Sequence, residues 1–436
     1  MIFLKSFKNI FLIPELRKKI LFTLGVLIID RLGTFIPIAG VNVTLLGQYM
    51  SQASNLGMFF SYLDTLSGSA IAKCTLFALG IAPYITASIM MQLLGMSIPF
   101  FEQLLKEGDY GRKQFNQYTR YLALALSVFY SISYATFLES QGLVINPGWG
   151  FRFLFIISLT SGAMFVMWLG DQISMYGIGN GSSMIIFAGI VSRFPDYVAR
   201  TIKYIELGNI NVLLAIAILL IFIAIIACIV FLEKGERKIP VQYARRIVGN
   251  KIYGGQNTYI PFKINTAGVM PVIFANSVLQ LPMFLINMLS ARFPTIQAFS
   301  AWFAVGGALF NTFEFLLIIF FTFFYTALIF NPDELAENMK KSGGFIPGIR
   351  PGKKTAQFFD YILTRIGLVG AIYLAFLAIF PNILTSVTRL PFYIGGTSLL
   401  IAVGVALEFS SQAESYLIEH RYEGFLSTGK IKGGSR

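Results

Sequence analysis

The sequence has few charged residues and very few residues that bind metals or form disulfides. Charged residues make up 13% of the 436 positions, about half of the roughly 25% found in soluble globular domains. One histidine, His420, and two distant cysteines, Cys74 and Cys228, cannot supply four tetrahedral zinc ligands or a disulfide framework. Low charge combined with 56% hydrophobic residues excludes disorder and indicates lipid as the main solvent.

Catalytic motifs are also missing. The chain contains no Walker A sequence, and its apolar runs hold no polar cluster that could perform covalent chemistry. We therefore expect a protein that is not an enzyme and uses no cofactor and no metal.

Long apolar segments dominate the chain. A membrane-spanning helix needs roughly 20 mostly apolar residues, and ten segments approach or reach that length. They are residues 20–38, 76–96, 121–137, 153–169, 182–194, 212–232, 266–289, 313–330, 366–380 and 392–409. The sequence therefore predicts an all-α polytopic membrane protein with ten transmembrane helices.

The net charge of +13 would suggest a nucleic-acid binder in a soluble protein. In a membrane protein, lysine and arginine instead collect in cytoplasmic loops. Most of the 34 basic residues fall in the segments that ten spans would place on one side, the side of both termini. We therefore expect both termini to be cytoplasmic.

Two of the cytoplasmic segments are unusually long and basic. Residues 233–263 and 331–365 exceed the roughly 12–15 residues of an ordinary connection. One interpretation is that they signal topology or contact lipid head groups. The other is that they bind an anionic partner.

An internal repeat relates the two halves of the chain. Residues 80–94 align without a gap with residues 268–282, and the matches include Gly80 with Gly268 and Pro83 with Pro271. These segments are the second and seventh predicted spans, so the halves 1–205 and 206–436 each hold five spans and cross the membrane in opposite senses. Interrupted spans at equivalent positions of inverted halves indicate a transport pathway.

The second predicted span carries a stripe of Ile81, Ile85, Ser88 and Gln92 at helical spacing. Apolar residues followed by polar ones suit a constriction beside a polar seam between helices, although an isoleucine stripe also suits plain packing. The stripe alone leaves both readings open.

Three functional classes suit a polytopic membrane protein of this composition. An ion-coupled secondary transporter of a small solute needs titratable residues inside the membrane, and the candidates are Asp30, Glu314 and Glu408. A membrane-integrated enzyme or insertase needs a polar catalytic cluster or a groove without a pore. The scarcity of such residues favours a passive conduit driven by a partner.

Seven motifs, in order and spread over nearly the whole chain, resemble the SecY family of protein-conducting channels. They are RLGTFIPIAGV (31–41), FALGIAPYITASIMMQLL (77–94), EGDYGRKQFNQYTRY (107–121), MWLGDQISMYGIGNG (167–181), INTAGVMPVIFANS (264–277), FNPDELAENMKKSGGFIPGIRPG (330–352) and GGTSLLIAV (395–403).

The resemblance implies two inverted, pseudo-symmetric five-helix halves around a pore. The family's aliphatic pore ring corresponds to Ile81, Ile85, Ile186, Ile273 and Ile401, and a sixth position, often isoleucine, is Ser182 here. The family's plug, a short helix that closes the pore from outside and docks lightly, corresponds to Ser67, Gly68, Ser69, Ala70, Ile71, Ala72, Lys73 and Cys74.

The resemblance also implies a lateral gate and a docking face. Candidate gate residues are Thr86, Ser88, Gln92, Asn276 and Leu281, and candidate docking residues are Arg245, Arg246, Arg350, Lys353 and Lys354.

The implied function is the central pore of a translocase in the bacterial inner membrane. This pore passes unfolded secretory polypeptides and releases transmembrane segments into lipid. The implied partners are the SecE and SecG subunits, the SecA ATPase, the large ribosomal subunit, signal sequences and nascent polypeptides.

Overall fold

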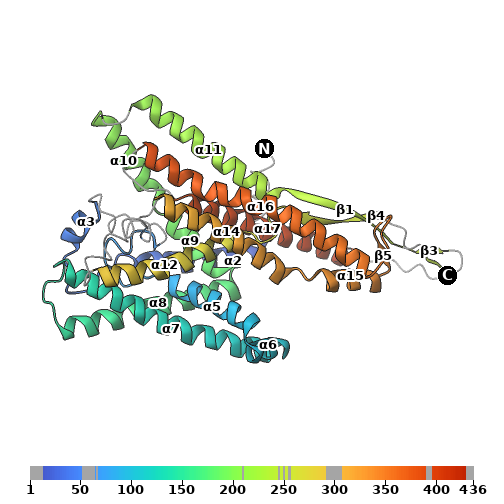
Figure 1. Ribbon diagram of the computed structural model, residues 1–436, viewed down its shortest axis with the longest axis horizontal. Coiled ribbons are helices and arrows are strands. Elements are labelled where there is room, and N and C mark those ends of the chain that lie inside the picture. Colours follow the sequence, from blue (N-terminus) through green and yellow to red (C-terminus); the bar gives the residue numbers. More distant parts are fainter. Residues whose placement is uncertain are drawn as a thin grey trace. The chain divides into compact units, whose positions relative to one another are not determined.

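The computed structural model of the chain describes residues 13–51, 64, 67–208, 211–243, 246–248, 251–253, 257–290, 307–388 and 395–428, most of them helical (Figure 1). The helices are α2 (Pro14–Gly33), α3 (Val43–Ser51), α5 (Ala82–Ser97), α6 (Pro99–Lys106), α7 (Asp109–Ser140), α8 (Trp149–Tyr176), α9 (Gly181–Val191), α10 (Phe194–Glu206), α11 (Val212–Lys234), α12 (Met270–Ser290), α14 (Ala308–Ile329), α15 (Pro332–Lys341), α16 (Lys353–Thr388) and α17 (Gly396–Thr428). The strands are β1 (Glu236–Tyr243), β2 (Arg246–Val248), β3 (Lys251–Tyr253), β4 (Asn257–Lys263) and β5 (Gly344–Phe345).

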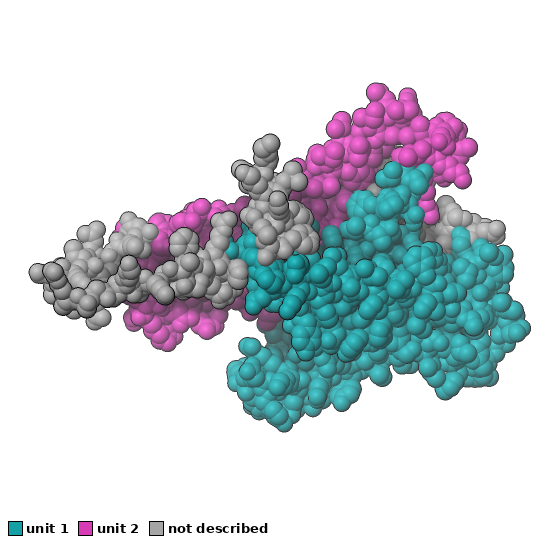
Figure 2. All heavy atoms as spheres, turned by 180° about the vertical axis from the view of Figure 1, so that it is seen from behind, with its two compact units in different colours: residues 1–199, 281–304, 405–436 teal, residues 200–280, 305–404 magenta. Residues whose placement is uncertain are grey.

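The chain divides into two compact units (Figure 2). Unit 1 comprises residues 1–199, 281–304 and 405–436, and unit 2 comprises residues 200–280 and 305–404. The predicted halves, 1–205 and 206–436, differ from these units mainly in residues 281–304 and 405–436. Helices α12 and α17 each contribute residues to both units.

Each of the ten predicted spans overlaps a helix. Within the described residues, six helices are long and apolar enough to cross a membrane, or seven if α5 and α6, which meet at a bend of 97°, form one span. The first predicted span, 20–38, is shifted: α2 begins at Pro14 and ends at Gly33. Proline suits a first helical position because its missing N–H would be unpaired there, so the helix incorporates the basic flank that the sequence reading left outside.

Helix α11 illustrates why these segments are stable in lipid. Its sequence from Val212 to Leu232 has no charged residue, and the Asn211 side chain caps its first turn. Large apolar side chains such as Leu213 and Phe231 remain exposed on its surface. An apolar helix satisfies its backbone hydrogen bonds internally, which is what a hydrocarbon environment requires.

The internal repeat has a local structural counterpart. Gly80 and Gly268 both have positive φ angles, +53° and +62°, and helices α5 and α12 both begin two residues later, at Ala82 and Met270. Pro83 and Pro271 are then the second residues of their helices. In both copies the glycine turns the chain and the proline starts the helix, so the motif does not kink a continuous helix.

The protein is mostly helical, but the prediction of an all-α protein is wrong for the two long basic segments, both of which contain strands. Residues 236–263 contain an antiparallel pair, β1 with β4, and β5 from the other long segment pairs with β1. Ile239 and Val241 are buried on β1 while Pro240 between them is exposed. This alternation buries one face of a strand. In the sequence it is masked by the many charged residues of the same segment.

Candidate functional site

The polar stripe predicted on α5 lies on one face of that helix. Ile85, Ser88 and Gln92 are all half-buried, and the Gln92 Nε2 atom donates to Ser88 Oγ over 3.5 Å. Away from this face, Ala87 is buried in a cluster with Ala123 of α7 and Met167 of α8. The helix therefore has one packed face and one face with partly accessible polar groups.

The three ring candidates of unit 1 come from two elements. Ile81 precedes α5 and is 5% exposed, and Ile186 of α9 is 7% exposed. A Cβ atom added to Gly170 of α8 would lie 3.1 Å from Ile81 Cδ1 and 3.5 Å from Ile185 Cδ1. The absence of a side chain at Gly170 thus lets isoleucines of both elements pack against α8.

Ser182, the departure from the family pattern, is engaged in a helix cap. Its Oγ atom donates to Asn180 Oδ1 over 2.6 Å, and its backbone N–H donates to the same oxygen. Asn180 caps α9 after a turn in which Gly179 has a φ of +87°.

The two ring candidates of unit 2 belong to helices that approach closely. Ile273 of α12 and Ile401 of α17 are both buried. A Cβ atom added to Gly404 of α17 would lie 2.0 Å from Val269 Cγ2, one turn before Ile273. The ring as a whole draws on both units, and its convergence stays a prediction.

The predicted plug segment is not a helix over 67–74. Ser67 is helical, and residues 68–74 form turns in which Gly68, Ser69 and Cys74 have positive φ angles. Three left-handed residues in so short a stretch are incompatible with a continuous right-handed helix. The secondary structure expected from the resemblance is therefore wrong at these positions.

The segment is also more firmly held than its small residues suggested. Ala70 and Ile71 are buried, the Tyr134 hydroxyl of α7 donates to the Ile71 carbonyl over 3.0 Å, and the Lys73 ammonium lies 4.7 Å from the centre of the Phe35 ring. The expectation of light docking does not describe this arrangement.

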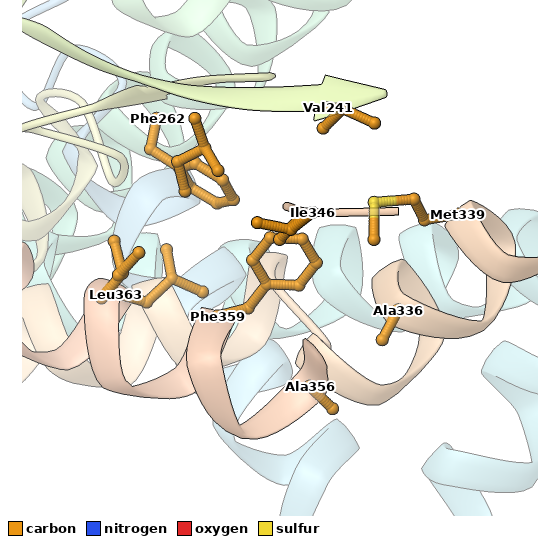
Figure 3. Close-up of a cluster of buried hydrophobic side chains, with 10 residues drawn as sticks. Val241, Phe262, Ala336, Met339, Ile346, Ala356, Phe359 and Leu363 are labelled. Atoms are coloured by element: carbon orange, nitrogen blue, oxygen red, sulfur yellow. The ribbon is translucent and has the colours of Figure 1, made fainter. Parts of the chain in front are cut away.

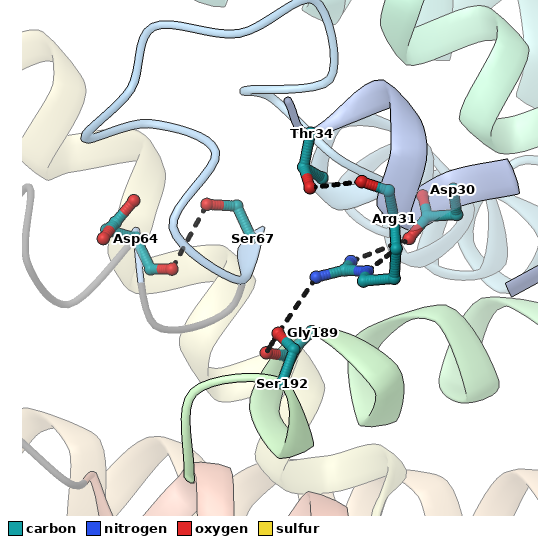
Figure 4. Close-up of polar contacts among 7 residues, drawn as sticks. All are labelled: Asp30, Arg31, Thr34, Asp64, Ser67, Gly189 and Ser192. Carbon is teal, nitrogen blue, oxygen red and sulfur yellow. Dashed lines mark hydrogen bonds and ion pairs between the residues drawn. The ribbon is translucent and has the colours of Figure 1, made fainter. Parts of the chain in front are cut away.

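Two arginines meet the plug segment near the end of α9. Arg31 of α2 pairs with Asp30 and donates to Ser192 Oγ over 3.1 Å, and Ser192 donates to the Gly189 carbonyl over 2.7 Å. Figure 4 shows Arg31 extending toward Ser192, with Ser67 bonded to the Asp64 carbonyl. The second arginine, Arg193, forms an ion pair of 3.0 Å with Asp64.

Burial changes the acid–base properties of this region. Burial raises the pKa of the Asp64 carboxyl, while Arg193 and the backbone N–H of Ala72 oppose the change. Burial likewise raises the pKa of the Cys74 thiol to about 12, against a smaller opposing effect of its hydrogen bond with Tyr134. The thiol is therefore protonated at neutral pH.

The gate candidates are distributed over both units. Thr86 is buried on α5 and donates to the Ala82 carbonyl over 3.1 Å. Asn276 is buried on α12, and Leu281 lies on the same helix but its side chain is outside the described residues. Their proximity to one another stays a prediction.

The two long basic segments fold together into one small domain, which we call the docking domain (residues 236–263 and 332–363). Figure 3 shows its core, in which side chains of β1 and β4 face those of α15 and the first turns of α16. The core residues are Ile239, Val241, Phe262, Ala336, Met339, Ile346, Ala356, Phe359, Ile362 and Leu363. Segments that are distant in the sequence thus share a single hydrophobic core.

A defined turn presents the main docking candidate. The N–H of Ile349 donates to the Ile346 carbonyl over 3.1 Å, with Pro347 and Gly348 between them and a φ of +83° at Gly348. Proline followed by a left-handed glycine is typical of a type II turn. Arg350 follows directly, and its carbonyl accepts from the buried Thr355 hydroxyl over 3.0 Å.

Three cations of this turn are available to a partner. Arg350, Lys353 and Lys354 are exposed, and none of them forms a salt bridge within the described part of the chain. Arg246 lies on β2, paired in register with Tyr253, and the structure describes only its backbone. Arg245 lies outside the described residues.

The positive charge of Lys238, on β1 of the docking domain, is partly neutralised by Glu236. The hydrogen bond that Lys238 donates to the Glu236 carboxylate raises the pKa of Lys238, with Tyr259 contributing in the same direction. Lys238 therefore remains charged, but its charge is shared with a carboxylate 3.2 Å away.

The carboxylates that a coupled transporter would need have local partners. Asp30 pairs with Arg31 over 2.7 Å, Glu314 accepts from Asn382 over 3.3 Å, and Glu408 accepts from Gln412 over 3.4 Å.

Asp64 and Arg193 were not recognised as site residues from the sequence. Asp64 stands alone in an apolar stretch, and Arg193 is one basic residue among several. A lone acid beside a predicted plug was the only available signal.

Comparisons with known proteins agree over most of the chain. The SecY family model matches residues 75–410. The protein translocase subunit SecY of Escherichia coli K12 is 42% identical over 428 residues, covering 97% of this chain and 96% of that protein.

Solved structures show the same fold. One is described as showing that the plug domain of the SecY protein stabilises the closed state of the translocation channel and maintains a membrane seal; its TM-score is 0.66, at 19% identity and 95% coverage of both chains. Another is Sec61 in the canine ribosome–channel complex from the endoplasmic reticulum, with a TM-score of 0.63, 19% identity and 95% coverage of both chains.

Proposed function

The chain belongs to the SecY family, and we propose that it forms the protein-conducting channel of a translocase. The observation that carries this proposal is identity of 42% with a translocase subunit over 97% of the chain. The transporter alternative has no support from these relatives. The channel performs no covalent chemistry.

We propose ten spans in two pseudo-symmetric halves, with both termini cytoplasmic in a bacterial inner membrane. The polypeptide path runs past Ile81, Ile85, Ile186, Ile273 and Ile401. An apolar constriction resists ion passage by dewetting, while side chains without fixed polar bonds adapt to any passing sequence. The plug segment closes this path from outside.

In this proposal the lateral gate comprises the half-buried polar face of α5 and the residues Asn276 and Leu281 of α12. Hydroxyl and amide groups such as Ser88, Gln92 and Asn276 hydrogen-bond across helices in a hydrocarbon environment. A signal sequence replaces these weak contacts with its own apolar surface, and a transmembrane segment leaves by the same route into lipid.

The docking domain binds the machine that drives transport. Exposed Arg350, Lys353 and Lys354 suit the polyanionic RNA of the large ribosomal subunit or acidic surfaces of SecA. Binding through exposed Lys and Arg side chains weakens as the salt concentration rises, because ions screen the charges. SecE and SecG complete the membrane complex.

Export from a reconstituted system tests the proposal. The chain is placed in vesicles with SecE and SecG, and SecA, ATP and an unfolded secretory precursor are added. We expect Arg350→Glu to reduce export at least tenfold while the docking domain stays folded, since the side chain is exposed. The control is Lys203→Glu, the same charge reversal at an exposed position of α10, which should export normally. Normal export by Arg350→Glu would refute the docking role, and absence of export by the unmodified chain would refute the channel.

A further inference from the structure

The strongest unexplained feature of the structure is the buried ion pair between Asp64 and Arg193. The side chains are 3% and 10% exposed. Most ion pairs of the described residues are on the surface, where they contribute about 0–1 kcal/mol. A buried pair differs, because removing one partner leaves the other charge in a poorly solvated place.

Asp64 connects the plug segment to α9 and also organises the segment itself. One carboxylate oxygen accepts from the Ala72 backbone N–H over 2.8 Å, and the other pairs with Arg193. The Asp64 carbonyl accepts from the backbone N–H of Ser69 over 3.1 Å. The residue thus spans the whole turn region and then attaches it to a neighbouring helix.

Both arginines lie near the C-terminal end of α9, where the last helical carbonyls carry partial negative charge. The backbone N–H of Arg193 donates to the Ile190 carbonyl, which places this residue directly after the helix. Arg193 also lies 5.7 Å from the centre of the Tyr197 ring. Arg31 already has Asp30 as its carboxylate partner, so Asp64 serves Arg193.

Gly68 allows the segment to reach this helix end. A Cβ atom there would lie 2.1 Å from Arg31 Nη1 and 3.0 Å from the Gly189 carbonyl oxygen. The plug backbone at Gly68 therefore lies close to the end of α9. Because Asp64 bonds to Ala72 of the segment and pairs with Arg193, moving the segment away from α9 strains or breaks one of these two contacts.

From this geometry we infer that Asp64 and Arg193 are positioning residues that hold the plug on the end of α9 and set the threshold for opening the channel. The inference rests on the proposed function. The pair is strong while the region is dry and weak once water enters, because hydrated charges attract each other far less than buried ones. Displacement of the plug, which admits water, therefore weakens the contact that opposed it.

The buried Cys74 provides a readout within the same segment. At pH 8 a thiol with a pKa of about 12 reacts far more slowly than an exposed thiol with a pKa of about 8.5, by roughly three orders of magnitude. In a Cys228→Ser background, the rate of maleimide labelling of Cys74 reports how often the segment leaves its seat.

The experiment uses the reconstituted complex and measures both this labelling rate and the resting ion conductance. We expect Asp64→Asn to raise both about tenfold or more, because Arg193 then lies buried without its carboxylate partner. The double variant Asp64→Asn with Arg193→Gln should label more slowly than Asp64→Asn alone, since the buried charge is gone. The control is Glu139→Gln, which breaks the more exposed pair with Arg152 and should change neither quantity.

The outcomes separate the inference from the proposed function. Suppose that the complex exports precursor and a signal peptide accelerates Cys74 labelling, but Asp64→Asn behaves as the unmodified chain. The role of Asp64 and Arg193 in holding the plug is then refuted, while the proposed channel function stands. Equal labelling of the double variant and Asp64→Asn would also refute the pairing. A complex that neither exports nor conducts refutes the channel itself.

Discussion

Truncation of Phe359 should unfold the docking domain while the membrane helices remain intact. Phe359 is 1% exposed, and its ring centre lies 5.6 Å from that of Phe262 on β4, so it joins the first turns of α16 to the sheet. Replacing a buried phenylalanine with alanine costs about 3–5 kcal/mol, which includes the cavity left behind. A domain with one small core has little stability beyond that amount.

Hydrogen exchange of the β1 amides measures this loss. Because each 1.4 kcal/mol is tenfold, protection of Ile239 and Val241 should fall roughly 100-fold or more in Phe359→Ala. Exchange in α7 and α8 should be unchanged. The control is Gln357→Ala, two residues earlier and exposed, which should leave protection as it is. Unaltered protection of β1 in Phe359→Ala would refute the idea that one core unites the two basic segments.

Three further predictions concern the membrane part. Gly68→Ala should accelerate maleimide labelling of Cys74, because a left-handed conformation costs an L-residue about 1–2 kcal/mol; an unchanged rate would mean that the seat tolerates a side chain. The double variant Ile85→Gly with Ile273→Gly should increase the resting ion conductance of the reconstituted complex. A conductance equal to that of the unmodified chain would exclude these two residues from the pore ring. A disulfide between Thr86→Cys and Leu281→Cys should block export reversibly, and undiminished export after confirmed crosslinking would remove this pair from the gate.

Several features followed from the sequence because they depend on local chemistry. Runs such as Val212 to Leu232 identify lipid-facing helices by composition alone, since backbone polar groups in hydrocarbon must be satisfied within the helix. The Gly-x-x-Pro repeat marked equivalent helix starts at α5 and α12, and the half-buried polar face with Ser88 and Gln92 followed from helical periodicity.

Other features could not be read from the sequence because they depend on distant contacts. The strand alternation around Val241 became meaningful only when α15 and α16 covered it, since neither basic segment can bury a core alone. The plug was expected to be a lightly docked helix, but positive φ angles and the burial of Ile71 follow from its neighbours on α7 and α9.

Composition and periodicity thus determined that lipid surrounds most of the chain, where its helices lie, and that positive charge gathers in two long segments. Tertiary structure decided which charges meet: Asp64 and Arg193 are 129 positions apart by number (193 − 64), and nothing local links a lone acid to one arginine among many. The physical reason is that helix formation depends on neighbours along the chain, whereas the strength of an ion pair depends on how well the folded protein excludes water from it.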